Sequence, residues 1–253
     1  MKYIYYNPGL GDHIVCNGLV RHISENFGEV SIFCKSNYFE NLKYMYRDDK
    51  DINVISVGED ENDSENGWIS DDLLIQKYIL DNNLQNDLVF ANLNYRLSNP
   101  KSIYTSFEGV KIFNIIGKLD CETFDKAYYK VLGIPFNIRF DKFFLERDYS
   151  IESDICKTLN PSGEKYIFTH NVDRTKVRSD LKIIENPTEY NIFNLISLIE
   201  NAEEVHLMES SIKNLVNSFK MNKPKFFYHP YVREEYNNPI FISNGLNKFE
   251  IIE

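Results

Sequence analysis

The stretch MKYIYYNPGLGDHIVCNGLVRHISENFG, residues 1–28, decides the fold. Residues 2–6 are rich in aromatic side chains, which is typical of a β-strand. Proline and two glycines in residues 7–12 then indicate a tight turn. Beyond the turn, apolar residues recur at intervals of four, which predicts an amphipathic helix that ends at Gly28. These apolar residues are Val15, Leu19, Ile23 and Phe27.

The same alternation of strand and helix patterns continues along the chain. Further strands are expected at residues 30–34, 52–57, 87–91, 143–146, 165–169, 204–208, 225–228 and 240–242. Further helices are expected at residues 38–46, 73–80, 123–132, 151–159, 192–199 and 212–219. This alternation of strands with helices is typical of parallel sheets. The boundary between two domains is expected near residues 146–150. The pattern thus predicts an α/β protein of two Rossmann-like domains, residues 1–147 and 148–253.

The composition narrows the class of function. A formal net charge of -10 argues against a nucleic-acid binder, which needs clustered lysine and arginine. No stretch approaches the roughly 20 apolar residues of a transmembrane helix, and residues 1–12 become polar too soon for a signal peptide. The cysteines are scattered, without a CxxC motif, which favours reduced thiols and a cytoplasmic protein. They are Cys16, Cys34, Cys121 and Cys156.

The first candidate site is the glycine-rich turn. Gly9 and Gly11 would let the backbone approach a ligand closely, and the N-terminus of the following helix offers N–H groups to an anion. The turn is not the dinucleotide-binding fingerprint, because Ile14 stands where a third glycine is needed. The alternative is a plain turn in which Asp12 is the N-cap of the helix.

The second candidate site is VHLMESS, residues 205–211, which leads from a predicted strand into a predicted helix. The hydroxyls of Ser210 and Ser211 can bind phosphate oxygens together with the helix N-terminus. The carboxylate of Glu209 can accept hydrogen bonds from sugar hydroxyls. The alternative is plain capping, because serine is a favoured N-cap residue.

The third candidate site follows the strand that ends at His170. Arg174, Lys176 and Arg178 place three cations within five residues, which would suit a diphosphate. The alternative is a solvated loop with a surface salt bridge. In open α/β sheets, ligands bind beyond the carboxyl ends of the strands. The three candidates therefore predict one ligand that carries phosphate.

Three segments resemble the heptosyltransferase-like glycosyltransferases. Residues 7–12 with the following helix resemble their N-terminal motif, and VHLMESSIKNLVN, residues 205–217, resembles their donor-site segment. Residues 128–148 are similar to the link between their halves. The resemblance implies the GT-B architecture, in which two Rossmann-like domains face a central cleft. Residues 1–147 would be the acceptor domain, and residues 148–253 would bind the donor, a nucleoside-diphosphate sugar.

The resemblance also implies roles for residues. Asp12 would be the general base that deprotonates an acceptor hydroxyl, on a glycan or another molecule, in an inverting, metal-independent transfer without a cofactor. Gly9 and Gly11 would approach the donor, whose ribose and diphosphate would be held by Glu209, Ser210 and Ser211. His170 and Arg174 resemble the histidine and arginine of fucosyltransferase donor sites, and Lys176 or Arg178 would meet the charge of the leaving diphosphate. Glu209 differs from the smaller residue or aspartate that the family has there.

Three alternatives remain open from the sequence. A Rossmann-type methyltransferase also has a glycine-rich, acidic first loop, but Cys34 and Lys35 stand where an acidic residue would close its second strand. A non-catalytic nucleotide-sugar binding module would keep Glu209 to Ser211 and would not need Asp12. A transferase that modifies nucleic acid is disfavoured by the negative net charge.

Overall fold

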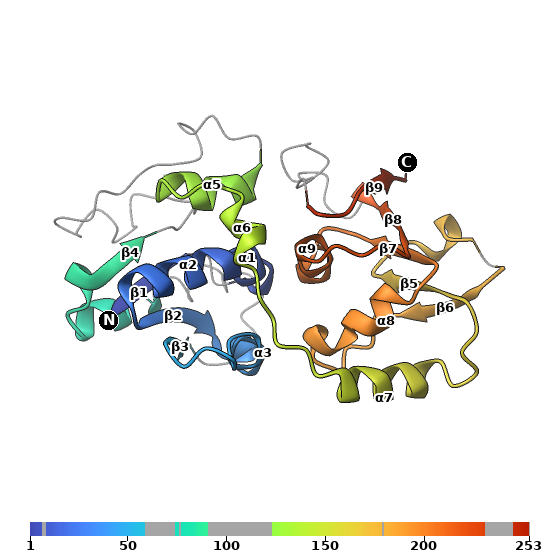
Figure 1. Cartoon of the computed structure of the whole chain (residues 1–253), viewed down its shortest axis with the longest axis horizontal. Helices are drawn as coiled ribbons and strands as arrows, with labels where there is room; N and C mark the ends of the chain where they lie inside the picture. Colours follow the sequence, from blue (N-terminus) through green and yellow to red (C-terminus); the bar gives the residue numbers. More distant parts are fainter. Residues whose placement is uncertain are drawn as a thin grey trace. The chain divides into compact units, whose positions relative to one another are not determined.

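A computed structural model divides the chain into two compact units, Met1–Leu145 and Glu146–Glu253 (Figure 1). Each unit contains a parallel β-sheet with helices, so the predicted α/β class is confirmed. The structure describes residues 1–6, 9–58, 74–75, 77–90, 123–178, 180–230 and 245–252. The units divide two residues before the boundary that the sequence predicts.

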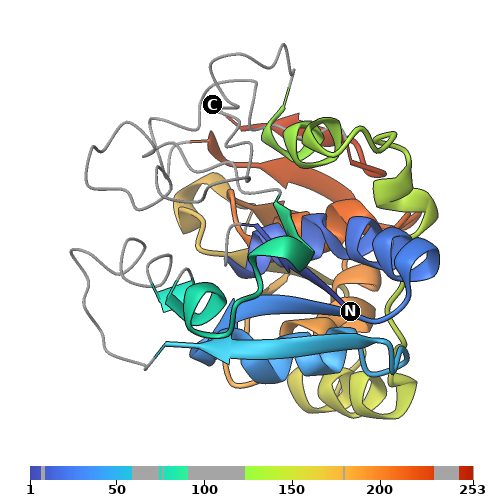
Figure 2. The ribbon, with the colours of Figure 1, turned by 90° about the vertical axis from the view of Figure 1, so that its left-hand side faces the viewer.

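In the first unit, the described residues form a four-stranded sheet in the order β3-β2-β1-β4, with all neighbours parallel (Figure 2). Its strands are β1 (Lys2–Tyr5), β2 (Val30–Lys35), β3 (Ile52–Val57) and β4 (Leu88–Phe90). Its α-helices are α1 (Leu10–Val15), α2 (Asn17–Phe27), α3 (Phe39–Met45), α5 (Phe124–Val131) and α6 (Ile138–Asp141). Short 3-10 helices are Ser36–Tyr38 and Gln85–Asp87.

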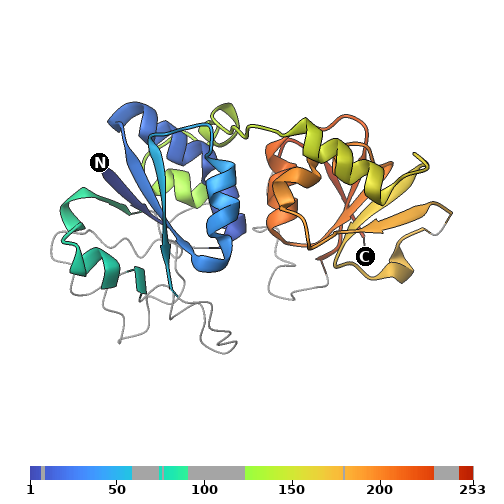
Figure 3. The ribbon, with the colours of Figure 1, turned by 90° about the horizontal axis from the view of Figure 1, so that it is seen from below.

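Alternation along the strands gives this sheet two buried faces. Tyr5 and Phe33 lie on one face and pack against the helical residues Ile75 and Ile79. The opposite face carries Ile4, which is completely buried, and α2 and α3 contact the neighbouring strands β2 and β3. Figure 3 shows helical residues 77–81 and α3 on opposite sides of the sheet. Two covered faces explain why these strands are apolar on both sides.

The helix that was predicted from intervals of four residues differs in two ways. It is interrupted at Cys16, which separates α1 from α2, and its last apolar residue, Phe27, is 67% exposed. The prediction that Phe27 shares one helix face with Val15, Leu19 and Ile23 is wrong because an interval of four overshoots the helical turn of 3.6 residues. The positions drift by about 80° between Leu19 and Phe27. The predicted end at Gly28 is confirmed, with φ at +80°.

In the second unit, the described residues form a five-stranded parallel sheet in the order β6-β5-β7-β8-β9. Its strands are β5 (Tyr166–His170), β6 (Lys182–Glu185), β7 (Glu204–Leu207), β8 (Lys225–Tyr228) and β9 (Phe249–Ile251). Its α-helices are α7 (Tyr149–Leu159), α8 (Ile196–Glu200) and α9 (Ser211–Ser218). Its 3-10 helices are η5 (Arg174–Lys176) and η6 (Ile192–Leu195). The strand predicted at residues 240–242 lies outside the described residues.

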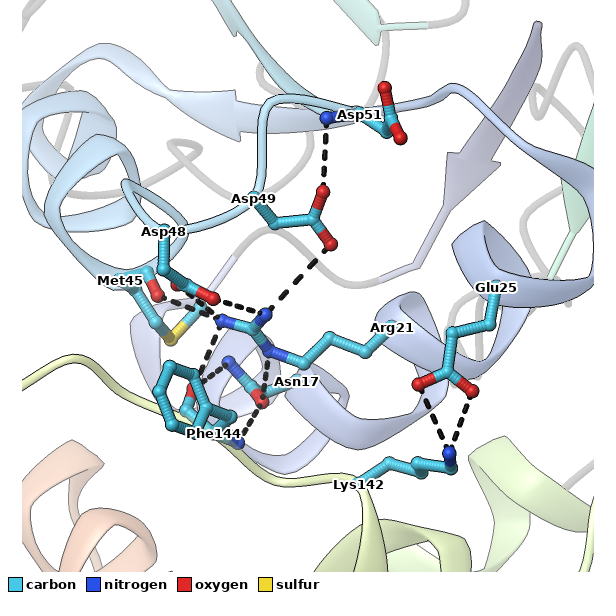
Figure 4. A network of polar contacts seen from close by, with 9 residues as sticks. All are labelled: Asn17, Arg21, Glu25, Met45, Asp48, Asp49, Asp51, Lys142 and Phe144. Carbon is cyan, nitrogen blue, oxygen red and sulfur yellow. Dashed lines mark hydrogen bonds and ion pairs between the residues drawn. The ribbon is translucent and has the colours of Figure 1, made fainter.

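Residues 143–146, which were predicted as a strand, belong to an irregular link instead. The side-chain amide of Asn17 binds both backbone groups of Phe144, at 3.1 Å to its N–H and 3.2 Å to its carbonyl oxygen. Arg21 donates to the same carbonyl at 3.1 Å (Figure 4). The prediction is wrong because side chains of α2 occupy the groups that a neighbouring strand would pair. On the other side of the link, Arg147 binds Glu152 at 2.9 Å.

Candidate active site

Asp12 lies in the first turn of α1, where its carboxylate is partly buried. The N-cap of this helix is Gly9, with extended backbone angles, and Gly11 lies inside the helix. The alternative that Asp12 is the N-cap is therefore wrong, because the helix begins two residues before Asp12. Instead, the Asp12 carboxylate accepts a hydrogen bond of 2.6 Å from the phenol of Tyr128 on α5.

Tyr128 is completely buried. Burial, together with the nearby Asp12 charge, raises the pKa of Tyr128 well above its usual value. The phenol therefore keeps its proton and is the donor in the bond to Asp12. Sequence reasoning missed this contact, since 116 residues separate the two positions and no local pattern links them.

His13, the neighbour of Asp12, is buried and neutral. Its Nδ1 lies 2.7 Å from the hydroxyl of Tyr6, and burial raises the pKa of Tyr6, so the phenol donates and Nδ1 accepts. Burial also lowers the pKa of His13 to about 3. In this tautomer Nε2 carries the proton, and it has no hydrogen-bond partner among the described residues. His13 is thus a weak base enclosed in the core.

At the second candidate site, the polar side chains mainly bind their own helix. Ser210 is the N-cap of α9, and its hydroxyl oxygen accepts from the backbone N–H of Lys213 at 3.3 Å. The carboxylate of Glu209 binds the ammonium of Lys213, whose side chain is 2% exposed. That ammonium also lies 4.8 Å from the centre of the Tyr228 ring. Ser211, the first residue of α9, is partly buried.

Lys213 was not among the predicted site residues. The spacing of four between Glu209 and Lys213 is the signal that could have found it, because such pairs face each other on a helix. A buried ammonium at the start of α9 adds positive charge to the site where a phosphate was expected. Glu209 compensates this charge.

At the third candidate site, two of the cations pair with carboxylates. Arg174 binds Glu185 at 2.9 Å, and both side chains are about half exposed. Arg178 binds Asp180 at 3.2 Å and Glu204 at 3.3 Å. The surface salt bridge that was the alternative for this loop is therefore present.

His170 and Lys176 complete the third site. His170, the last residue of β5, is partly buried, and burial lowers its pKa. Its Nδ1 has no hydrogen-bond partner in the described part of the chain. Lys176 is exposed and ends η5.

Sequence reasoning also missed a buried polar chain that joins β7 to the residue after β8. His206 Nε2 lies 3.3 Å from the carboxylate of Glu204, and His206 Nδ1 lies 2.9 Å from Nε2 of His229. If the carboxylate accepts from Nε2–H, Nδ1 of His206 must accept from Nε2–H of His229. Burial lowers the pKa of both histidines, that of His229 to about 4. Glu204 and His206 are two residues apart in β7 and therefore lie on the same face of the strand. This spacing is the signal in the sequence that could have found the pair.

The described residues contain neither a metal-binding cluster nor a membrane-spanning helix. No three or more His, Cys, Asp or Glu side chains are grouped there so that they could hold a metal ion. In the same residues, no helix is both long enough and apolar enough to cross a membrane. Cys16, Cys34 and Cys156 are free thiols, whereas Cys121 lies outside the described residues.

Three solved structures are similar to the chain over most of its length. A glycosyl transferase of family 9 from Veillonella parvula shares 10% identity, with 98% of this chain and 86% of that chain covered and a TM-score of 0.60. The E. coli ADP-heptose lps heptosyltransferase II shares 9% identity, with 100% and 90% covered and a TM-score of 0.49. E. coli heptosyltransferase WaaC with ADP-2-deoxy-2-fluoro heptose shares 11%, with 100% and 93% covered and a TM-score of 0.47.

The chain shares the fold of the family 9 glycosyl transferase. The fold implied by the sequence resemblance, GT-B with two Rossmann-like units, is thereby confirmed. At 10% identity, this similarity concerns the fold alone. No family model and no curated protein matches the chain.

Proposed function

We propose that the protein is a glycosyltransferase that moves one sugar from a nucleoside-diphosphate sugar to an acceptor hydroxyl. The proposal rests mainly on the position and contacts of Asp12. In a chain with a glycosyl transferase fold, a partly buried carboxylate follows the first strand and is held by a tyrosine from a distant helix. A general base needs such a fixed carboxylate.

In the proposed reaction, the acceptor oxygen attacks the anomeric carbon as its proton passes to Asp12. The new bond between carbon and the acceptor oxygen forms, the bond between carbon and the diphosphate oxygen breaks, and the diphosphate leaves with the electron pair. Attack opposite the leaving group inverts the anomeric configuration, in keeping with the resemblance in sequence. The first unit takes the acceptor and the second unit takes the donor.

Positive groups of the second unit would bind the donor diphosphate. The hydroxyl of Ser211 and the N-terminus of α9 supply hydrogen-bond donors, and the ammonium of Lys213, which is paired with Glu209, belongs to the same first turn of the helix. Arg174 and Arg178 already bind carboxylates, but the pairs with Glu185 and Asp180 are half exposed or more, and such pairs are worth only about 0–1 kcal/mol. A diphosphate can therefore displace such partners. These cations would stabilise the leaving group without a metal ion.

A screen of nucleotides by thermal shift, followed by a transfer assay, tests the proposal. UDP, GDP, ADP, CMP and S-adenosylmethionine are each added with and without EDTA. We expect one nucleoside diphosphate to raise the melting temperature equally in both conditions, because a ligand that binds the folded state stabilises it. The corresponding nucleotide sugars are then tested for transfer to sugar acceptors and for slow hydrolysis.

The other outcomes separate the alternatives. Stabilisation by S-adenosylmethionine alone would indicate a methyltransferase. Binding of a nucleoside diphosphate without transfer or hydrolysis would indicate a non-catalytic binding module. A strict requirement for a divalent metal in donor binding would contradict the metal-independent mechanism.

A further inference from the structure

Two neighbouring tyrosines on α5 direct their hydroxyls to different kinds of acceptor. Tyr128 donates to the carboxylate of Asp12 at 2.6 Å, whereas Tyr129 donates to the backbone carbonyl of Val15 at 2.8 Å. Both tyrosines are completely buried, and both bonds join α5 to α1. A tyrosine that only fastened α5 to α1 would need no more than a main-chain acceptor, as Tyr129 shows. Attachment of α5 to α1 alone therefore does not explain why Tyr128 donates to a carboxylate.

The bond between Tyr128 and Asp12 has the features of a charge-assisted hydrogen bond. Its length is within the range of about 2.5–2.7 Å that such O–H···O bonds show. The Tyr128 ring has little freedom, because it is buried and meets the ring of Tyr6 edge-on, with 6.3 Å between ring centres. A donor that is fixed in this way holds its acceptor in one orientation.

We propose that Tyr128 is the positioning residue of the general base, and that its hydroxyl keeps the Asp12 carboxylate ionised and oriented to receive the acceptor proton. The inference rests on the proposed function of Asp12. Donation of a hydrogen bond to a carboxylate favours its charged form. Near neutral pH the base is then available in nearly every molecule, and no rotation of its side chain precedes attack.

The protonation of Asp12 can be measured without a substrate. Protein labelled with ¹³C at aspartate carboxyl carbons is titrated by NMR, and the Asp12 signal is assigned by its loss in Asp12→Asn. In Tyr128→Phe we expect the titration midpoint of this signal to move to higher pH by about one unit. Tyr129→Phe is the matched control, because it removes a buried hydroxyl from the same helix and leaves Asp12 untouched. Its midpoint should equal that of the parent.

The pH dependence of kcat/KM then tests the link to catalysis, with the nucleotide sugar that the transfer assay identifies. The acidic limb of the profile should move to higher pH by about the same unit in Tyr128→Phe and stay in place in Tyr129→Phe. An unchanged midpoint and limb in folded Tyr128→Phe would overturn the inference and leave the proposed function standing. Normal turnover in Asp12→Asn would instead overturn the role of Asp12 as the base.

A second variant guards against failure of Tyr128→Phe to fold. Replacement of Tyr128 by 3-fluorotyrosine keeps the ring and the hydroxyl but makes the phenol a stronger acid. The hydrogen bond to Asp12 should strengthen, so the midpoint should move to lower pH than in the parent. No movement in this variant would also contradict the inference.

Discussion

The two strand-to-helix junctions that carry the candidate residues are held in different ways. After β1, the acidic residue Asp12 binds a tyrosine that lies 116 residues away in the sequence. After β7, the acidic residue Glu209 binds Lys213 of the helix that it precedes, and Ser210 caps that same helix. The first junction is thus fixed by tertiary structure, and the second by local contacts. A group fixed from outside its own helix suits chemistry, whereas locally paired groups suit a ligand that can displace their partners.

The largest expected effect comes from Asp12→Asn. The amide keeps the shape and can still accept the hydrogen bond from Tyr128, but it cannot take a proton. We expect turnover to fall by at least about 100-fold, while the melting temperature and donor affinity stay nearly unchanged. Turnover and a donor titration on the same preparation measure this.

Glu40→Gln is the matched control for Asp12→Asn. Glu40 is an acidic residue in the first turn of another helix of the same unit, α3. Its replacement should leave turnover unchanged. Loss of folding in Asp12→Asn would mean that the carboxylate is mainly structural, and near-normal turnover would exclude it as the base.

The second junction is tested by replacing both Ser210 and Ser211 with alanine. A lost N-cap alone costs about 1 kcal/mol of stability. If the two hydroxyls also bind the donor diphosphate, donor affinity should fall by about 10-fold or more, because each hydrogen bond to a charged group is worth about 1.5–3 kcal/mol. Calorimetry on the folded double variant measures the affinity.

Asp148→Ala separates capping from binding. Asp148 is the N-cap of α7 in the same unit and accepts from the backbone N–H of Ile151 at 3.1 Å. This variant should lose similar stability and keep the parental donor affinity. Equal affinities in both variants would place the diphosphate elsewhere.

The contrast between the junctions also explains what could be predicted from the sequence. Local patterns predicted β1, α9 and the stop at Gly28 because each depends on neighbours within one helical turn or strand. The strands β6 and β9 were missed because each offers only two apolar residues beside charged ones, whereas β1, which is no longer than β6, offers three. The bond from Tyr128 to Asp12, and the pairing of Asn17 with Phe144 that replaced a predicted strand, join residues more than 100 positions apart. Such contacts appear only in the folded chain.

The first junction is expected to lose stability at low pH. Burial lowers the pKa of His13 from 6.5 to about 3 in the folded protein. Between these two pH values, the unfolded chain therefore binds a proton at His13 and the folded protein does not. Stability is therefore fully present above pH 6.5 and falls as the pH decreases toward 3. The contribution of His13 is up to about 1.4 kcal/mol for each pH unit.

Urea unfolding at several pH values measures this dependence. In His13→Gln the loss of stability per pH unit between pH 6 and 4 should be smaller than in the parent. His22→Gln is the control, since His22 is not buried, and it should keep the parental slope. Equal slopes in the parent and in His13→Gln would show that His13 takes up a proton without unfolding.

The smallest expected effect concerns the salt bridge between Arg174 and Glu185, which are both about half exposed. If Arg174 must leave Glu185 to bind the donor diphosphate, the pair opposes binding by its own stability, which is about 0–1 kcal/mol. Glu185→Gln should therefore tighten nucleoside-diphosphate binding by up to about fivefold, and Arg174→Gln should weaken it. The gain should shrink at high salt, because screening already weakens an exposed pair.

Lys157→Gln breaks a comparable exposed pair with Asp154 on α7 and should not change the affinity. Weaker binding in Glu185→Gln would mean that the carboxylate holds Arg174 in the binding geometry. The local ion pair would then be part of a preformed donor site, and the ligand would not displace it.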